Sequence, residues 1–365
     1  MTTTKLPPLV YMDGLNFISK LFGGDMSYWD LPSFQTNVTR LVNVFRSNHV
    51  ELVVFIDASR FTKEAIYKYQ SRRERDIVSN TPRLHYKETL LGDAFRKNDI
   101  PVLYSHGADN DDTIAAFAQQ DGAAILSQDQ DYFRYNGRTF PIYQGYTKKK
   151  GVLQLIPGKL NTKRFTSKRN IIPIPDTIIH SPSLADIKFG FYRGNADTPL
   201  LKIFGNPNIA ARPLRLALYS KLGIHSPITE IFPIWVDDKV EWTDDIVQAD
   251  PTLIDLLSNP EQAVTQLMSA FLIRPSDIQD SIWENHIFGL YAVIFNICAM
   301  ATNGQKSLLS YLINFRPSPS FVYTFKCCIC HESSGLTQKQ VTFFNEKRYK
   351  YPKRCFTCIE KSKHI

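Results

Sequence analysis

Residues 10–16 read VYMDGLN, and residues 54–60 repeat the same pattern as VFIDASR. In each stretch a short apolar run ends at a carboxylate, Asp13 in the first and Asp57 in the second. Continuous apolar runs of this length are typical of strands that are buried on both faces of a sheet. The two stretches therefore predict buried strands that each carry an acidic residue at the carboxyl end.

The pattern continues along the first 145 residues. Further apolar runs cover 101–104, 123–126 and 139–143, and helical patterns at 34–47, 63–78, 87–97 and 111–120 separate the runs. Alternating strands and helices indicate an α/β domain with a doubly wound, mostly parallel sheet. We expect this domain at 1–147, a basic linker or loop at 148–181, a mainly helical domain at 182–320 and a small zinc ribbon at 321–365.

Carboxylates follow four of the expected strands, and ligands of an open parallel sheet bind at the carboxyl ends of its strands. The six are Asp13, Asp57, Asp109, Asp111, Asp129 and Asp131. Gathered at one edge, they would repel one another unless two hard cations, Mg²⁺ or Mn²⁺, neutralised them. Two such ions about 4 Å apart can hydrolyse a phosphodiester. A single Asp of this kind is more often a helix cap, and Asp129-Gln130-Asp131 alone also fits a loop or a sugar-nucleotide transferase.

The acidic stretches resemble motifs of the PIN/flap-endonuclease superfamily, and the asteroid-type branch is the most similar. They are VYMDGLN, VFIDASR, DNDDTIAAFA at 109–118 and LSQDQDYFRY at 126–135. Asp109 stands where that branch usually has Glu. GNP at 205–207, RPLR at 212–215 and FPIW at 232–235 extend the likeness over roughly residues 9–260. The resemblance implies a PIN-like fold and a metal-dependent nuclease.

Basic residues are concentrated in three places of a chain whose formal net charge is +8. Residues 326–365 hold nine Lys/Arg and three Glu, and 132–175 hold ten Lys/Arg and no acid. The helix after Asp57 carries Lys63, Lys68, Arg72 and Arg73, and its equivalent in flap endonucleases grips the scissile phosphate. These clusters indicate a nucleic-acid partner, although a solvated helix face would look the same. Nearby tyrosines, among them Tyr67, Tyr69 and Tyr86, fit either stacking on bases or the core.

Two Cys-x-x-Cys pairs lie near the end of the chain. Cys327 with Cys330 and Cys355 with Cys358 can together form a tetrahedral Cys₄ site for a structural Zn²⁺. The basic and aromatic residues around them suit nucleic acid, and a protein partner almost equally well. Cys298 lies in an apolar helix and is expected in the core.

The sequence thus predicts an Mg²⁺- or Mn²⁺-dependent nuclease for single-stranded or flap-like DNA or RNA, with endonuclease action as the working prediction. The alternative is an inactive nuclease fold that serves as a nucleic-acid-binding or protein scaffold. Neither a membrane-spanning run nor a secretory leader is evident, so we expect the nucleus or cytoplasm and no membrane partner. DNA versus RNA, polarity and oligomeric state stay open.

Overall fold

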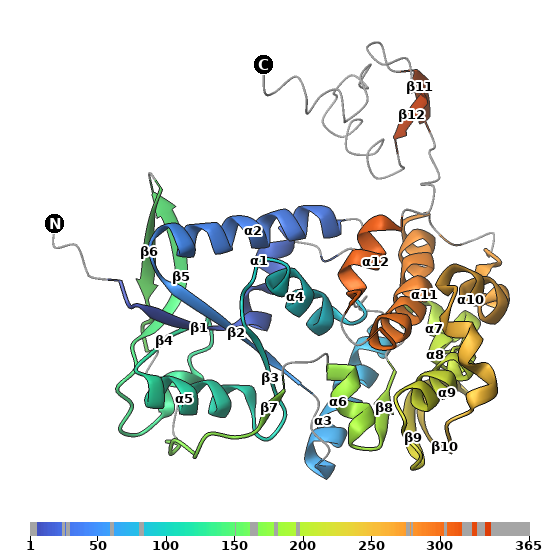
Figure 1. Cartoon of the computed structure of the whole chain (residues 1–365), viewed down its shortest axis with the longest axis horizontal. Helices are drawn as coiled ribbons and strands as arrows, with labels where there is room; N and C mark the ends of the chain where they lie inside the picture. Colours follow the sequence, from blue (N-terminus) through green and yellow to red (C-terminus); the bar gives the residue numbers. More distant parts are fainter. Residues whose placement is uncertain are drawn as a thin grey trace.

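A computed structural model describes most of the chain (Figure 1). The described residues are 6–23, 26, 30–58, 62–79, 84–149, 151–160, 167–178, 182–194, 198–274, 278, 280–302 and 305–315, together with the backbone of 323–326 and 333–336. Both Cys-x-x-Cys pairs of the expected zinc ribbon lie outside these residues. Within the described backbone, only the short antiparallel pair β11 (Tyr323–Lys326) and β12 (Ser333–Leu336) belongs to that region.

A seven-stranded sheet forms the centre of the N-terminal part, in the order β6-β5-β4-β1-β2-β3-β7. Its strands are β1 (Leu9–Asp13), β2 (Glu51–Asp57), β3 (Val102–Ser105), β4 (Ala124–Leu126), β5 (Ile142–Lys149), β6 (Val152–Pro157) and β7 (Thr177–Ile178). The inner five strands pair in parallel, and only β6 and β7 at the two edges pair antiparallel. The predicted α/β class with a mostly parallel sheet is confirmed.

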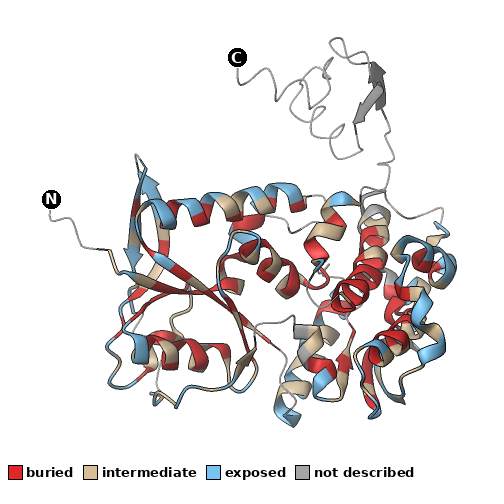
Figure 2. Cartoon of the chain, in the orientation of Figure 1, coloured by how far each residue is buried: buried red, intermediate tan, exposed pale blue. Residues whose placement is uncertain are grey.

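Helices cover both faces of this sheet (Figures 1 and 2). Helices α2 (Leu31–Ser47) and α4 (Lys87–Arg96) pack on one face, and α5 (Asn110–Asp121) packs on the other. Side chains of a strand alternate between the faces, so Val54 and Ile56 join one hydrophobic core and Phe55 the opposite one. This double burial explains why the strands read as continuous apolar runs.

The order of the strands creates a switch point at β1. Strand β1 pairs with β2 on one side and with β4 on the other, so the chain winds away from β1 in two directions. Loops that leave the carboxyl ends of β1 and β4 therefore diverge and leave room for a ligand. Asp13 ends β1, and Asp129 and Asp131 follow β4 directly.

The segment 148–181, which the sequence suggested as a linker or loop, needs correction. It completes β5 and supplies β6 and β7, the two edge strands of the main sheet. The basic residues and the breakers of this stretch concealed the strands, because edge strands tolerate charge and proline. The outer limits of the expected domains stay predictions.

The described part of the region 182–320 is mainly helical, as expected. Its helices are α6 (Pro182–Lys188), α7 (Thr198–Phe204), α8 (Pro207–Ala210), α9 (Arg212–Lys221), α10 (Pro260–Leu267), α11 (Asp280–Met300) and α12 (Leu308–Asn314), with the 3-10 turns η4 (Pro251–Leu257) and η5 (Ser269–Leu272). It also contains a three-stranded sheet that was not anticipated, β8 (Phe191–Arg193), β9 (Ile228–Val236) and β10 (Lys239–Val247).

A buried ion pair holds α9 against this small sheet. Arg215 and Glu230 are both fully buried, and the guanidinium donates to both carboxylate oxygens at 2.7 and 2.8 Å. Arg215 also donates to the backbone oxygen of Asn208, and Tyr219 donates to Glu230. The RPLR motif therefore has a structural role here, because its Arg215 is the centre of this network.

The two regions share one hydrophobic core. Helix α12 packs on α2 and α4, and the side chain of Asp93 in α4 accepts a hydrogen bond from the backbone nitrogen of Leu309 at the start of α12. A single cluster of buried side chains runs from Val10 in β1 to Leu312 in α12. Cys298 is buried in that cluster, as predicted. Among the described helices, none combines the length and the apolar character needed to cross a membrane.

Candidate functional site

Three carboxylates converge where β4 ends and α5 begins. Asp111, Asp129 and Asp131 each offer one oxygen, and these atoms all lie within 4.8 Å of one another. We call these residues the acidic triad. The turn after β4 brings two of them together, since the backbone nitrogen of Asp131 donates to Asp129 Oδ1 at 3.0 Å and that of Asp129 donates to Ser127 Oγ at 3.1 Å.

Asp13 lies beside the triad and is almost completely buried, at 3% exposure. Four side chains donate hydrogen bonds to its carboxylate: Asn16, Asn110, Ser127 and Tyr132. Burial and, after it, the neighbouring charge of Asp111 raise the pKa of Asp13 to about 7, although the hydrogen bond from Ser127 lowers it. The donors therefore hold the carboxylate in one orientation without removing the cost of its charge.

The residue after Asp13 must be small. Gly14 lies against β2, and a Cβ atom at this position would sit 2.9 Å from Val54 Cγ1 and 3.2 Å from the backbone oxygen of Phe55. Only glycine allows β1 to turn away directly after its carboxylate at this distance. The Asp-Gly step of the first motif is thus explained by packing as well as by charge.

The carboxyl groups of the triad crowd one another. Burial and the charges of Asp129, Asp109 and Asp131 together raise the pKa of Asp111 to about 6, against a hydrogen bond with Tyr132 that lowers it. Carboxylate oxygens at this spacing are the donor set that hard divalent cations prefer. A cation bound here would relieve the mutual repulsion, so the residues fit such an ion.

The remaining predicted acids, Asp57 and Asp109, lie outside the acidic triad but influence Asp13 and Asp111 through their charge. Asp57 ends β2 and acts on Asp13 through its charge, and Asp109 precedes α5 and acts on Asp111 in the same way. Neither belongs to the group that lies within 4.8 Å. Asp112, which follows Asp111 directly, accepts hydrogen bonds from Tyr135 at 2.5 Å and Arg169 at 3.4 Å.

A basic hollow of about 270 Å³ opens next to Asp57. Helix α3 (Lys63–Val78) contributes Lys68, Arg72 and Arg73 to its wall, and these are three of the four cations for which the sequence predicted a role in nucleic-acid binding. Two further cations, Lys87 and Arg193, line the same hollow. We call it the α3 hollow.

Lys63 and the tyrosines on or near α3, which the sequence also suggested as substrate contacts, lie in different surroundings. Lys63 does not line the α3 hollow. Tyr86 is buried in the core, and Tyr69 lies under the guanidinium of Arg193 at 4.8 Å from its ring centroid. Tyr67 is 72% exposed and is the tyrosine of this group that is open to solvent.

Sequence reasoning missed the residues that hold the acids in place. Asn16, Asn110, Ser127 and Tyr132 all lie inside the acidic motifs but carry no charge. Ser105 adds a further layer, because its hydroxyl donates to Asn110 Oδ1 at 2.7 Å. The sequence feature that could have identified these positioning residues is the presence of amide and hydroxyl side chains within three residues of the carboxylates.

No profile of a known protein family matches the chain. Among solved structures, the catalytic core of Rad2 in complex with DNA substrate matches with a TM-score of 0.29 and 14% identity, over 41% of this chain and 48% of that one, about half its length. Bacteriophage T5 5′-exonuclease with zinc bound matches with a TM-score of 0.26 and 16% identity, over 84% and 97%. Human GEN1 with Holliday junction DNA matches with a TM-score of 0.25 and 10% identity, over 93% and 92%.

Proposed function

We propose that this chain is a metal-dependent nuclease that hydrolyses phosphodiester bonds of DNA or RNA. The observation that carries the proposal is the convergence of Asp111, Asp129 and Asp131 at the switch point of the sheet, beside the buried Asp13. The α3 hollow lies against the neighbouring strand end through Asp57, so cations and carboxylates share one edge of the sheet. That pairing of charges suits a phosphodiester, which needs its charge neutralised and its phosphorus activated.

The triad would hold Mg²⁺ or Mn²⁺, with Asp13, Asp57 and Asp109 as further acidic residues of a site for two ions. When bound, such cations lower the pKa of the attacking water and stabilise the charge on the departing oxygen. The protein keeps these carboxylates close together at a cost in repulsion, visible in the raised pKa of Asp111. Asp13 is held by four donors, so its position does not depend on the ion.

The cations of α3 would bind the substrate. Lys68, Arg72 and Arg73 face the α3 hollow and can donate hydrogen bonds to phosphate oxygens. Their positive charge would stabilise the transition state, in which negative charge builds on the phosphoryl oxygens. Lys63, at the start of the same helix, would contribute only to the general attraction of the polyanion.

Single-stranded or flap-like substrates, an endonuclease mode and the asteroid-type PIN-like branch belong to this proposal. So does a structural Zn²⁺ on Cys327, Cys330, Cys355 and Cys358, in a ribbon that would contact nucleic acid or a protein partner. Spacing supports the zinc site, since two Cys-x-x-Cys pairs supply four thiolates.

The experiment is cleavage of labelled single-stranded, duplex and 5′-flap DNA and RNA with Mn²⁺, by wild type and by an Asp129→Asn/Asp131→Asn variant. Cleavage by the wild type alone supports the nuclease and identifies the substrate. Tight, salt-sensitive binding by both proteins without cleavage would instead favour the inactive scaffold. In that case the acidic triad would be a remnant.

A further inference from the structure

A second basic hollow lies on the other side of the acidic triad. It has a volume of about 340 Å³, and Arg134, Arg138 and Lys168 line it together with Phe133 and Tyr135. No carboxylate is among the described residues that line it. We call it the β4 hollow, because its first residues follow the turn after β4. Arg134 is paired with Asp131, and Arg138 and Lys168 add two further cations, so the hollow is suited to an anion. Its volume exceeds what a single small ion needs.

The basic stretch 132–175 folds back on itself to build the β4 hollow. The backbone nitrogen of Arg169 donates to the oxygen of Arg134 at 3.0 Å, and that of Asn136 donates to the oxygen of Arg169 at 2.8 Å. These bonds bring Lys168 next to residues that lie thirty positions earlier in the chain. Arg138 is fixed separately, with its guanidinium 5.3 Å from the ring centroid of Phe133.

Arg134 connects the β4 hollow to the acidic triad. Its Nη1 atom donates to Asp131 Oδ2 at 3.2 Å, and its other nitrogens donate to the backbone oxygen and the hydroxyl of Ser167 at 3.1 and 2.6 Å. One residue of the β4 hollow, Arg134, is therefore in direct contact with the triad. An anion bound in it would lie within one side chain of the carboxylates.

The two hollows lie at opposite ends of the acidic edge. Asp57 at the end of β2 lines the α3 hollow, and the turn after β4 leads into the β4 hollow, with β1 and Asp13 between these strands. Neighbouring strands are about 4.8 Å apart, so β2 and β4 stand roughly 10 Å apart. A polyanion that spans this edge from one hollow to the other would pass the triad, because Arg134 of the β4 hollow is bonded to Asp131.

We infer that the β4 hollow binds backbone phosphates of a nucleic-acid strand on the side of the triad away from α3, through Arg138 and Lys168, with Arg134 positioned between phosphate and Asp131. The inference rests on the proposed function and deepens it, because it gives the strand a path across the site. Backbone phosphates suit the hollow better than a base does, since its charged groups are all cations and the ring of Phe133 is covered by Arg138.

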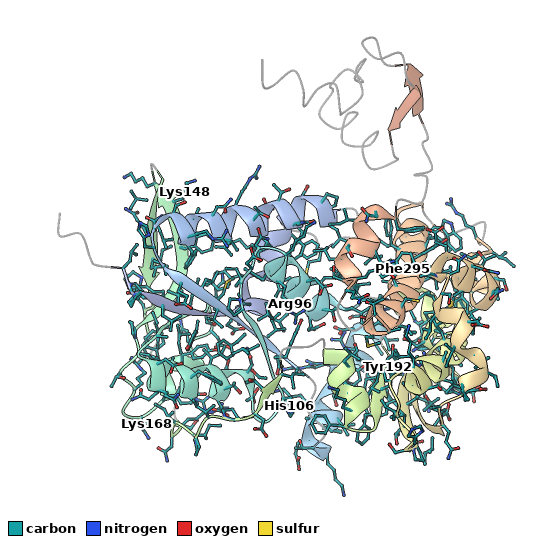
Figure 3. All side chains as sticks on the ribbon, in the orientation of Figure 1. Arg96, His106, Lys148, Lys168, Tyr192 and Phe295 are labelled. Carbon is teal, nitrogen blue, oxygen red and sulfur yellow. The ribbon has the colours of Figure 1, made fainter. Side chains whose placement is uncertain are left out.

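The test uses the full chain and a labelled single-stranded oligonucleotide, without added Mg²⁺ or Mn²⁺ so that binding is measured apart from cleavage. The variants are Arg138→Gln/Lys168→Gln and the charge-reversed Arg138→Glu/Lys168→Glu. Lys148→Glu is the matched control, because Lys148 belongs to the same basic stretch and is exposed. Figure 3 shows Lys148 at the upper left, by the β5–β6 hairpin, and Lys168 at the lower left, near α5.

We expect the Gln variant to bind at least tenfold more weakly at 0.1 M salt. Its slope of log affinity against log salt should fall by roughly 1.4, two single-strand phosphate contacts at about 0.7 each. One or two neutral methylphosphonate linkages should weaken binding by wild type but not by the Gln variant. Lys148→Glu and the Gln variant each lower the net charge by two units. Equal losses in these two would overturn the inference, because attraction by the whole basic stretch would then explain them.

The outcomes separate the two proposals. A wild type that binds through the β4 hollow but never cleaves with Mn²⁺ leaves this inference standing and contradicts the nuclease. A wild type that cleaves, with an unchanged salt slope in the Gln variant, contradicts this inference alone. Melting curves of all variants confirm that each one is folded before its affinity is compared.

Discussion

The hydroxyl group of Ser127 donates a hydrogen bond to Asp13 at 3.1 Å and accepts one from the backbone nitrogen of Asp129, also at 3.1 Å. This one side chain thus connects the acidic end of β1 to the turn after β4, across the switch point of the sheet. The position of the triad relative to Asp13 therefore depends on an uncharged residue that is fully buried.

Replacement of Ser127 by alanine should lower the free energy of unfolding by about 1–3 kcal/mol, because a buried carboxylate loses a donor. Urea unfolding without metal measures this loss. Ser33→Ala, on the exposed side of α2, is the control and should change stability by no more than about 0.5 kcal/mol. If the two variants were equally stable, the bond between Ser127 and Asp13 would not contribute.

The Asp111→Asn variant should be more stable than the wild type when no metal is present. It removes a charge that is disfavoured by burial and by three neighbouring carboxylates, a gain of about 1–2 kcal/mol at neutral pH. With Mn²⁺ at 100 times its dissociation constant, the wild type should gain about 2.7 kcal/mol and the variant nothing. Thermal melts with and without Mn²⁺ measure both effects. Equal gains with Mn²⁺ would remove Asp111 from the site.

A buried histidine should make the protein sensitive to acid. Burial and, after it, the charge of the nearby His286 lower the pKa of His85 to about 4. The unfolded chain binds a proton near pH 6.5 and the folded one near 4, so this stability is present above about 6.5 and is lost as pH falls toward 4.

Between pH 7 and 5 the loss from His85 alone should be roughly 2 kcal/mol. The His85→Gln variant should therefore show a shallower decline of unfolding free energy than the wild type over this range. His225→Gln, at an exposed position, is the control and should follow the wild-type curve. Parallel curves for wild type and His85→Gln would show that His85 does not titrate on unfolding.

The buried ion pair of Arg215 and Glu230 should contribute far more to the free energy of unfolding than the partly exposed ion pair of Arg212 and Asp245. Glu230→Gln leaves the fully buried guanidinium without a counter-charge, which should cost about 3–5 kcal/mol. Asp245→Asn breaks the partly exposed pair with Arg212 and should cost at most about 1 kcal/mol. Denaturant midpoints of the two variants make the comparison. Similar midpoints would mean that the RPLR motif is not explained by this network.

The sequence predicted the large sheet well because its signals are local. Strands β1 to β4 are apolar runs, and the helices α3, α4 and α5 have bounds within about two residues of those expected. The hairpin of β9 and β10 was missed for physical reasons. Pro233 lies within β9, β10 contains Asp244 and Asp245, and these residues are unfavourable in strands.

The sequence of the turn in that hairpin did not indicate a tight turn either. Asp237 and Asp238 both have positive φ, 46° and 59°, in a two-residue connection that usually contains Asn-Gly or Asp-Gly. For the candidate site, the sequence placed the six acids at one edge but could not give the direction of each side chain. Packing around Asp13 and the contacts of Asp112 with Tyr135 and Arg169 set those directions.

The most direct measurement of the central claim compares two adjacent carboxylates, Asp111 in the triad and Asp112 outside it, which is bonded to Tyr135 and Arg169. Both are changed to Asn, and the rate of cleavage with saturating Mn²⁺ is measured on the best substrate of the wild type. We expect Asp111→Asn to lose on the order of 10³-fold in rate, about 4 kcal/mol of transition-state stabilisation, and Asp112→Asn to stay within about tenfold of the wild type. Equal rates in the two variants, or full activity in Asp111→Asn, would contradict a metal site on the acidic triad.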